Sequence, residues 1–145
     1  MKVIIADLKK TEKIARDLAK KVLTKETKSA VVIGLEGELG SGKTTFAQFF
    51  AKALGIKRKI QSPTFVIVKK HEIRSTKSET ISKSKNLKFK TLVHIDAYRI
   101  EKPKEILELG WRKLIANPQN IILIEWADII KKILPKDYIR IKLRI

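Results

Sequence analysis

The 145-residue sequence contains no cysteine, and its uninterrupted apolar runs are short, as in residues 121–124. The lack of cysteine excludes disulfides, thiolate metal sites and a cysteine nucleophile, and it is typical of a reducing compartment. A membrane-spanning helix needs roughly 20 apolar residues, and an export signal needs a basic segment before an apolar one. We find neither pattern, and we therefore expect a cytoplasmic protein without a membrane segment.

Acidic residues are scarce as well. The chain has 15 Asp and Glu against 33 Lys and Arg, a formal net charge of +18, while 43% of its residues are hydrophobic. This apolar share is ordinary for a globular protein and the length is that of a typical domain, so we predict one folded domain over residues 1–145. The positive charge attracts polyanions such as nucleic acid, but a lysine-rich solvated surface explains it equally well.

The spacing of apolar residues predicts strands that alternate with helices. Two segments have the near-continuous apolar composition of strands buried on both faces of a sheet: 30–35 and 121–124. Strand composition also predicts strands at 2–5, 65–71, 89–95 and 138–145. Helical periodicity predicts helices at 11–24, 43–54, 103–109, 111–116 and 128–134.

This order of elements favours an α/β sandwich around a largely parallel central sheet. Segments 65–71 and 89–95 are predicted to form an antiparallel hairpin. The loop between them, about 73–88, is rich in Ser, Lys and Thr. We expect this loop to be mobile, because so few apolar residues cannot offset the entropy lost on ordering it.

Residues 37–44, GELGSGKT, match the pattern GxxxxGK[ST] between a predicted buried strand and an amphipathic helix. In this context the glycines let backbone amides point at a phosphate, and the start of the helix adds its positive dipole end. Lys43 would reach the β and γ phosphates, and the Thr44 hydroxyl would coordinate Mg²⁺. A glycine-rich turn without a ligand is the weaker alternative. The residues predicted to bind the nucleotide are Glu38, Leu39, Gly40, Ser41, Gly42, Lys43, Thr44 and Thr45.

Two carboxylates, Asp96 and Glu125, each follow an apolar strand. In parallel sheets such strand ends lie beside the phosphate loop. One carboxylate could hold Mg²⁺ through water while the other orients or deprotonates the nucleophile. Either residue could instead cap the segment that follows it.

Four motifs occur in the order and spacing of one family: GELGSGKT at 37–44, SPTF at 62–65, HIDAYR at 94–99 and EW at 125–126. Over nearly its whole length the sequence resembles the bacterial TsaE-like ATPases of tRNA threonylcarbamoyladenosine synthesis. The resemblance implies a P-loop NTPase fold, with ATP and Mg²⁺ as cofactors. It also implies a cytoplasmic ATPase that supports a threonylcarbamoyl transferase, built of TsaD-like and TsaB-like subunits, acting on the adenosine next to the tRNA anticodon.

The same resemblance implies roles for individual residues. Thr44 and Asp96 correspond to the metal-binding residues, and Thr64, in the switch segment 62–65, corresponds to a γ-phosphate sensor. The residues implied in catalysis are Lys43, Glu125 and Trp126. Three departures affect the hairpin and its surroundings rather than the ATP site: His71 in place of a usual Tyr, the long basic loop 73–88, and Ala127 where Pro is frequent.

Several alternatives stay open from the residues alone. His94 is better interpreted as a packed histidine that is hydrogen-bonded within the site than as a proton-transfer group. Trp126 is either core filler or a shield that keeps water from Glu125. Arg99 either places positive charge on the transferring phosphoryl group or forms an ion pair. Because the site looks incomplete without a partner, we expect slow hydrolysis by the isolated chain.

Other function classes share some of these features. A small-molecule kinase would use the same phosphate loop, but the chain lacks an obvious lid and acceptor-binding segment. A nucleic-acid-binding module with a vestigial ATP site would not need intact Lys43, Thr44, Asp96 and Glu125. With two histidines and no cysteine, we predict no structural zinc. Contact with tRNA is expected either indirectly or through the basic hairpin loop, where Lys83, Lys85 and Lys88 lie.

Overall fold

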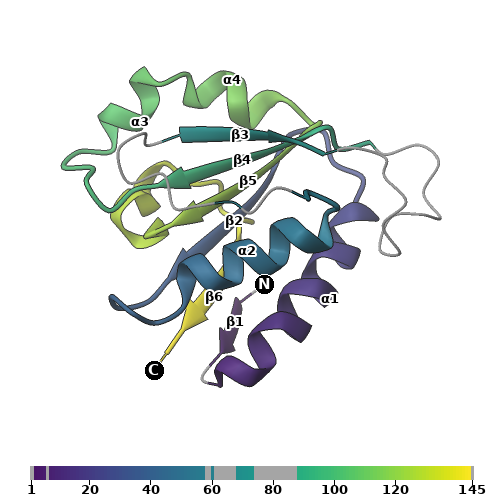
Figure 1. Ribbon diagram of the computed structural model, residues 1–145. Coiled ribbons are helices and arrows are strands. Elements are labelled where there is room, and N and C mark those ends of the chain that lie inside the picture. The colour runs from purple at the N-terminus through teal and green to yellow at the C-terminus, as the bar shows by residue number, and fades with distance from the viewer. Residues whose placement is uncertain (1, 6, 58–59, 61–67, 74–87, 145) are drawn as a thin grey trace.

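The computed structural model describes residues 2–5, 7–57, 60, 68–73 and 88–144. These residues form a six-stranded sheet with the strand order β1-β6-β2-β5-β4-β3 (Figure 1). All neighbouring strands are parallel except β3 and β4, which pair as an antiparallel hairpin. The strands are β1 (Lys2–Ile5), β2 (Val31–Glu36), β3 (Val68–Glu72), β4 (Thr91–Asp96), β5 (Asn120–Glu125) and β6 (Ile139–Leu143).

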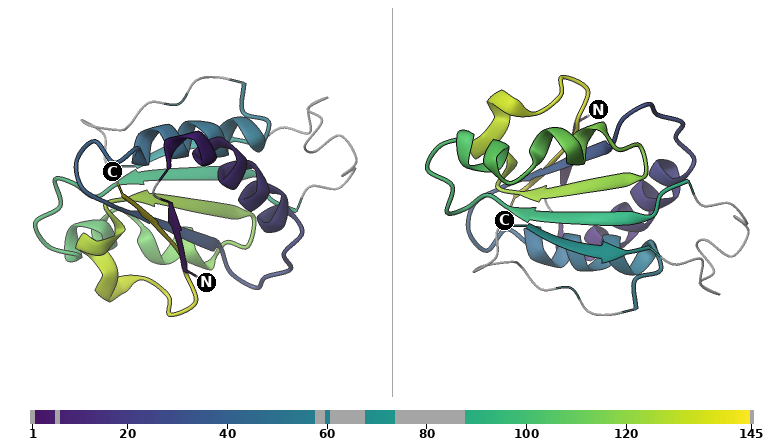
Figure 2. Two further views of the ribbon diagram at one scale, coloured as in Figure 1. Left: turned by 90° about the horizontal axis from the view of Figure 1, so that it is seen from below. Right: turned by 90° about the horizontal axis from the view of Figure 1, so that it is seen from above.

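Helices cover both faces of this sheet (Figure 2). Helices α1 (Thr11–Leu23) and α2 (Lys43–Ala53) pack against each other on one face, and the short 3₁₀ helix η1 (Leu8–Lys10) leads into α1. The other face is covered by α3 (Lys104–Glu108), α4 (Trp111–Ala116) and the 3₁₀ segment η2 (Ala127–Ile133). The three layers confirm the predicted α/β sandwich with a largely parallel sheet.

Each sheet face has its own apolar core, because successive strand residues point to opposite sides. On β2, Ile33 and Leu35 pack with α1 and α2, whereas Val32 packs with the helices of the other layer. Every residue of β2 and of β5 is buried, as the two continuous apolar runs predict. Within the described ranges, no helix is long and apolar enough to cross a membrane.

The structure refines two predicted segments. The short helix predicted at 128–134 is the 3₁₀ helix η2, and Ile130 interrupts it with non-helical backbone angles. The ends of the predicted loop 73–88 belong to the folded body. Ile73 is buried and its backbone amide donates to Lys90 O at 2.8 Å, while Lys88 Nζ donates to Thr27 O at 2.6 Å. The remainder of that loop, 74–87, and the predicted strand residues 65–67 lie outside the described residues.

Gly34, in the middle of β2, lets Ala127 of η2 and the ring of Tyr138, the residue before β6, approach the sheet closely. A Cβ atom at this position would lie 2.7 Å from the Ala127 Cβ and 2.8 Å from Tyr138 Cε2. Both separations are shorter than real carbon contacts, and the Ala127 Cβ is attached directly to backbone and cannot rotate away. The missing side chain of Gly34 therefore sets how closely the segment after Glu125 packs on β2.

We expect Gly34→Ala to lower the free energy of unfolding by about 1–3 kcal/mol, because the added methyl overpacks a closed contact. Urea denaturation monitored by circular dichroism measures this change. The double variant Gly34→Ala with Ala127→Gly should recover part of the loss, since it removes one of the two clashing carbons. Equal stability of wild type and Gly34→Ala would show that the contact is not close-packed.

Candidate functional site

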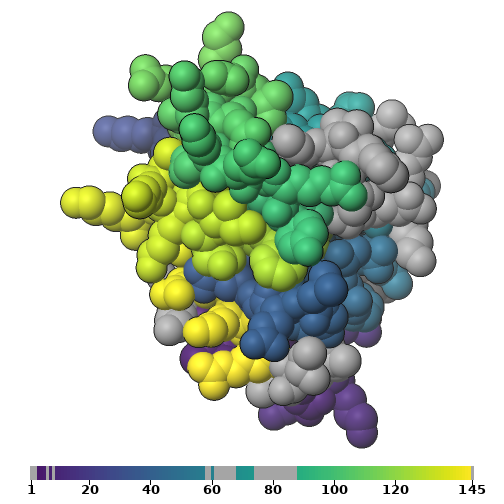
Figure 3. Space-filling view, turned by 90° about the vertical axis from the view of Figure 1, so that its left-hand side faces the viewer, coloured from purple at the N-terminus to yellow at the C-terminus, as the bar shows by residue number. Residues whose placement is uncertain are grey.

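The glycine-rich loop predicted to bind phosphate joins the end of β2 to the start of α2. Gly42 has φ +98°, a left-handed conformation that favours glycine, and helix α2 begins at the next residue, Lys43. The first amides of a helix have no partners within it, so the positive end of α2 opens toward the ends of β4 and β5. Figure 3 looks onto this end of the molecule, where the blue segment that contains the loop adjoins the yellow-green segment that follows β5.

Lys43 folds back into its own loop. Its ammonium donates to Gly37 O at 2.6 Å, Glu38 O at 2.8 Å and Ser41 Oγ at 3.3 Å, and the residue is only 5% exposed. Burial lowers the pKa of Lys43, and the negative charges of Glu125, Asp128 and Asp96 oppose that shift. The loop thus holds a desolvated cation at the centre of a ring of oxygen atoms.

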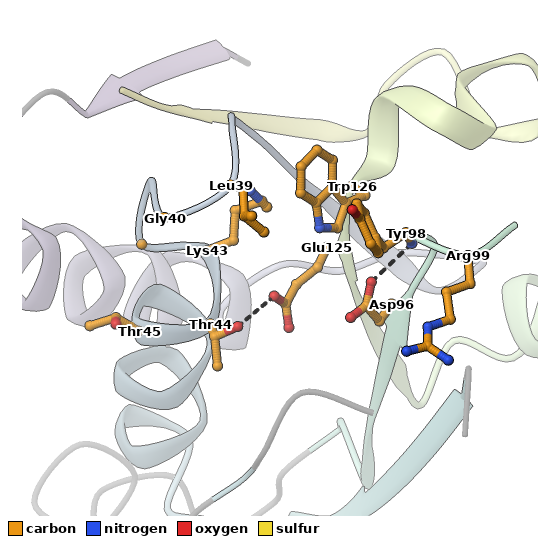
Figure 4. Close-up of a pocket in the computed structure, with 11 residues that line it drawn as sticks. Leu39, Gly40, Lys43, Thr44, Thr45, Asp96, Tyr98, Arg99, Glu125 and Trp126 are labelled. Carbon is orange, nitrogen blue, oxygen red and sulfur yellow. Dashed lines mark hydrogen bonds between the residues drawn. The ribbon is translucent and has the colours of Figure 1, made fainter. Parts of the chain in front are cut away.

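Glu125 connects the loop helix to the sheet. The Thr44 hydroxyl donates to Glu125 Oε1 at 2.8 Å, although the two residues are 81 positions apart in the sequence (Figure 4). The other oxygen, Oε2, is 2.6 Å from His94 Nε2 on the neighbouring strand β4. Both His94 and Glu125 are buried. This contact confirms the interpretation of His94 as a histidine hydrogen-bonded within the site.

Asp96 ends β4 in the same register position at which Glu125 ends β5. Its carboxylate accepts a hydrogen bond from the Tyr98 amide at 3.0 Å, which shapes the turn after the strand (Figure 4). Sequence reasoning placed the metal on Thr44 and Asp96. The carboxylate that bonds directly to Thr44 is that of Glu125, because β5 is the neighbour of β2 whereas β4 is one strand farther away. Strand order, which no single motif encodes, decides this.

A pocket of about 460 Å³ brings most of the predicted residues together. Such a volume lies in the range of sites that bind small molecules. Tyr98 and Arg99 also line the pocket. Of these two, only Arg99 is a candidate site residue from the sequence alone. The lining consists of Leu39, Gly40, Gly42, Lys43, Thr44, Thr45, Asp96, Tyr98, Arg99, Glu125 and Trp126.

Among the described positions, two predicted residues do not line this pocket. Ser41 is buried behind the loop, where it accepts from Lys43. Glu38 lines a separate cavity of about 330 Å³ beside β6 and contributes its carbonyl oxygen to Lys43. Thr64 and the switch segment 62–65 lie outside the described residues.

Trp126 faces the ammonium of Lys43. The Lys43 Nζ lies 3.8 Å from the centroid of the Trp126 ring, a cation–π contact, and the Tyr98 ring lies 4.9 Å away on a tilted plane. The backbone of Trp126 has φ +61°. No other non-glycine residue within the described ranges has a positive φ. Such strain is uncommon and concentrates at functional sites. The ring packs partly on the apolar core, but its distinctive contact is with Lys43.

The polar groups of the pocket fit a nucleotide with Mg²⁺. A hydroxyl and two carboxylates, from Thr44, Glu125 and Asp96, are hard oxygen donors of the kind that Mg²⁺ prefers. Within the described ranges, no cluster of three or more His, Cys, Asp or Glu residues could hold a metal ion by itself. Mg²⁺ commonly binds through one or two carboxylates together with substrate phosphates, so this incomplete set of protein ligands suits a metal that arrives with phosphate.

A phosphate loop between a buried parallel strand and a helix, with carboxylates at the ends of the next two strands of the sheet, β5 and β4, defines a P-loop protein of the α/β class. A family model described as threonylcarbamoyl adenosine biosynthesis protein TsaE matches residues 5–145. The chain therefore belongs to the TsaE family.

Individual relatives agree with this assignment. The tRNA threonylcarbamoyladenosine biosynthesis protein TsaE of Bacillus subtilis is 37% identical over 113 residues, which cover 78% of this chain and 61% of that protein. The corresponding Rickettsia typhi protein is 35% identical over 136 residues, which cover 93% and 83%. The crystal structure of Bacillus subtilis YdiB superposes with a TM-score of 0.61 at 29% identity, covering 96% of this chain and 72% of that one.

The contact between Lys43 and Trp126 predicts an optical signal for ligand binding. In a Trp111→Phe variant, Trp126 is the remaining tryptophan, and we expect its fluorescence to change when phosphate oxygens draw the ammonium away from the ring. The control is Trp126→Phe, which leaves Trp111, 3% exposed in the apolar core, as the reporter. That variant should respond weakly to Mg·ATP. An equal response from both variants would show that the signal is not local to the pocket.

Proposed function

We propose that this chain binds Mg·ATP in the pocket of Lys43, Thr44 and Glu125 and hydrolyses it in support of threonylcarbamoyl transfer to tRNA. The observation that supports this most strongly is the 2.8 Å bond from Thr44 to Glu125. It joins the hydroxyl at the end of the phosphate motif to a buried carboxylate within a pocket of nucleotide-binding size. A glycine-rich turn with no ligand would not need a buried carboxylate there.

Lys43 and the first amides of α2 bind the phosphates in this proposal. The ammonium exchanges the carbonyl oxygens of Gly37 and Glu38 for phosphate oxygens, and Trp126 limits the water around it. Because the lysine is already desolvated, little further desolvation is needed when the ligand arrives. The pocket is therefore preorganised for a polyanion.

Thr44, Glu125 and Asp96 would hold the metal. A hydroxyl has one proton to donate and lone pairs to share, so Thr44 can keep its bond to Glu125 while its oxygen faces Mg²⁺. When bound, the metal ion supplies positive charge that offsets the charge developing on the phosphates. Glu125 keeps lone pairs on both oxygens. We propose that it also orients the attacking water. Asp96 would supply the second carboxylate and could hold the metal through water.

Membership of the TsaE family supports the partners that we propose. In the cytoplasm, ATP binding and hydrolysis by this chain would support TsaD-like and TsaB-like subunits. The substrate of those subunits would be tRNA. Arg99 lines the pocket and could stabilise phosphoryl transfer within the chain. Even so, we propose slow turnover by the isolated chain and faster turnover with partners. The described strand ends Glu72 and Thr91 lie at the opposite end of the β3–β4 hairpin from Asp96.

Lys43→Ala should weaken Mg·ATP binding about tenfold to a hundredfold, since it removes a charged donor to phosphate. Isothermal titration calorimetry measures the affinity. The unfolding midpoint should stay close to that of wild type. The control is Lys52→Ala, an exposed lysine at the other end of α2, which should bind normally. Normal affinity of the Lys43 variant would contradict the proposed site.

Glu125→Gln should still bind ATP, with a smaller Mg²⁺-dependent gain in affinity, and should slow hydrolysis about a hundredfold or more, the typical cost of losing a general base or water-orienting carboxylate. Phosphate release in the presence of the partner subunits measures the rate. The matched control is Glu36→Gln, another buried carboxylate at a strand end, which instead pairs with Arg140. Unimpaired hydrolysis by the Glu125 variant would remove Glu125 from the mechanism. Phosphate transferred to a small-molecule acceptor rather than to water would indicate a kinase.

A further inference from the structure

His94 is a fully buried polar residue, and its side chain is hydrogen-bonded to the carboxylate of Glu125. Its relative exposure is 0%, and its Nε2 lies 2.6 Å from Glu125 Oε2. An ionised carboxylate has only acceptors, so the imidazole N–H is the donor. The other ring nitrogen, Nδ1, has no hydrogen-bond partner among the described residues. The bond to Glu125 is therefore the polar contact that compensates for burying this ring.

The sheet itself does not require a histidine at this position. His94 pairs in register with Leu123 on β5. Leu92, two residues earlier on the same face of β4, is a buried aliphatic residue in the core beneath α2. An aliphatic side chain would extend that core without a polar atom to satisfy. The histidine is thus explained by what it does for Glu125 rather than by packing.

The two bonds to Glu125 fix both of its oxygens. Thr44 donates to Oε1 from helix α2, and His94 donates to Oε2 from strand β4. With donors on both oxygens, rotation of the carboxylate would break one bond or both. Hydrogen bonds to ionised groups in low-dielectric surroundings are the strong ones, so the restraint is substantial.

We propose that His94 is a positioning residue that locks the Glu125 carboxylate in the orientation that presents Oε1 to Thr44. This inference rests on the proposed function, in which Thr44 and Glu125 serve the metal and the attacking water. It assigns His94 no contact with substrate. Losing a partner that orients a metal-site carboxylate typically costs roughly 10- to 100-fold in metal affinity or activity.

The test compares three substitutions of His94 that differ in reach. Gln extends an amide N–H to about the depth of the imidazole Nε2, Asn is too short to reach Glu125, and Leu has no donor. The control is His71→Leu, the same change at the other buried histidine, which lies on β3 opposite Leu92 and outside the pocket. Each variant is measured for ATP affinity with Mg²⁺ and in EDTA, for hydrolysis rate with partner subunits, and for unfolding midpoint.

We expect His94→Leu and His94→Asn to keep the Mg²⁺-free ATP affinity, to lose roughly tenfold or more of the Mg²⁺-dependent gain in affinity, and to lower kcat by roughly 10- to 100-fold. His94→Gln should restore most of both, and His71→Leu should change neither. If His94→Leu does not fold, the comparison of Gln with Asn decides the matter. Wild-type metal dependence and kcat in both Asn and Gln variants would overturn the inference. Failure of the wild type to bind nucleotide would instead refute the proposed function.

Discussion

The hydrogen bond between Thr44 and Glu125 is the interaction on which the rest of the site depends. It fastens the first turn of α2 to the end of β5, and so it links the phosphate loop to the sheet at the point where the carboxylates gather. The parallel pairing of β2 with β5 makes the bond possible, since it brings the ends of two strands from distant parts of the sequence to the same edge. The same pocket is also lined by Lys43, Trp126 and Asp96.

Close packing and local strain both serve that arrangement. The contact of Gly34 with Ala127 seats the segment after Glu125 against β2, and the left-handed backbone of Trp126 turns its ring over Lys43. A strained tryptophan and a buried ammonium each cost stability in a protein without a ligand. The two apolar cores on either face of the sheet offset that cost, as expected where a fold supports a binding site.

Most of the fold could be predicted from the sequence because its signals are local. The apolar runs of β2 and β5, the helical periodicity of α1 and α2, and the glycine-rich motif each depend on neighbouring residues. The 3₁₀ geometry of η2 was not predictable, because the apolar spacing of residues 128–134 does not distinguish a short 3₁₀ helix from a short α-helix. The hydrogen bond from Thr44 to Glu125 could not be predicted either. Both Asp96 and Glu125 end buried strands, and only strand order, a long-range property, distinguishes them.

The most direct test of this account is a crystal structure with Mn²⁺ and a non-hydrolysable ATP analogue, in which anomalous scattering locates the metal. The account predicts a metal peak about 2.1 Å from Thr44 Oγ1, with the triphosphate in the glycine-rich loop and the Glu125 carboxylate still in contact with Thr44. A metal bound away from Thr44 and Glu125, or a nucleotide bound outside the loop, would contradict it.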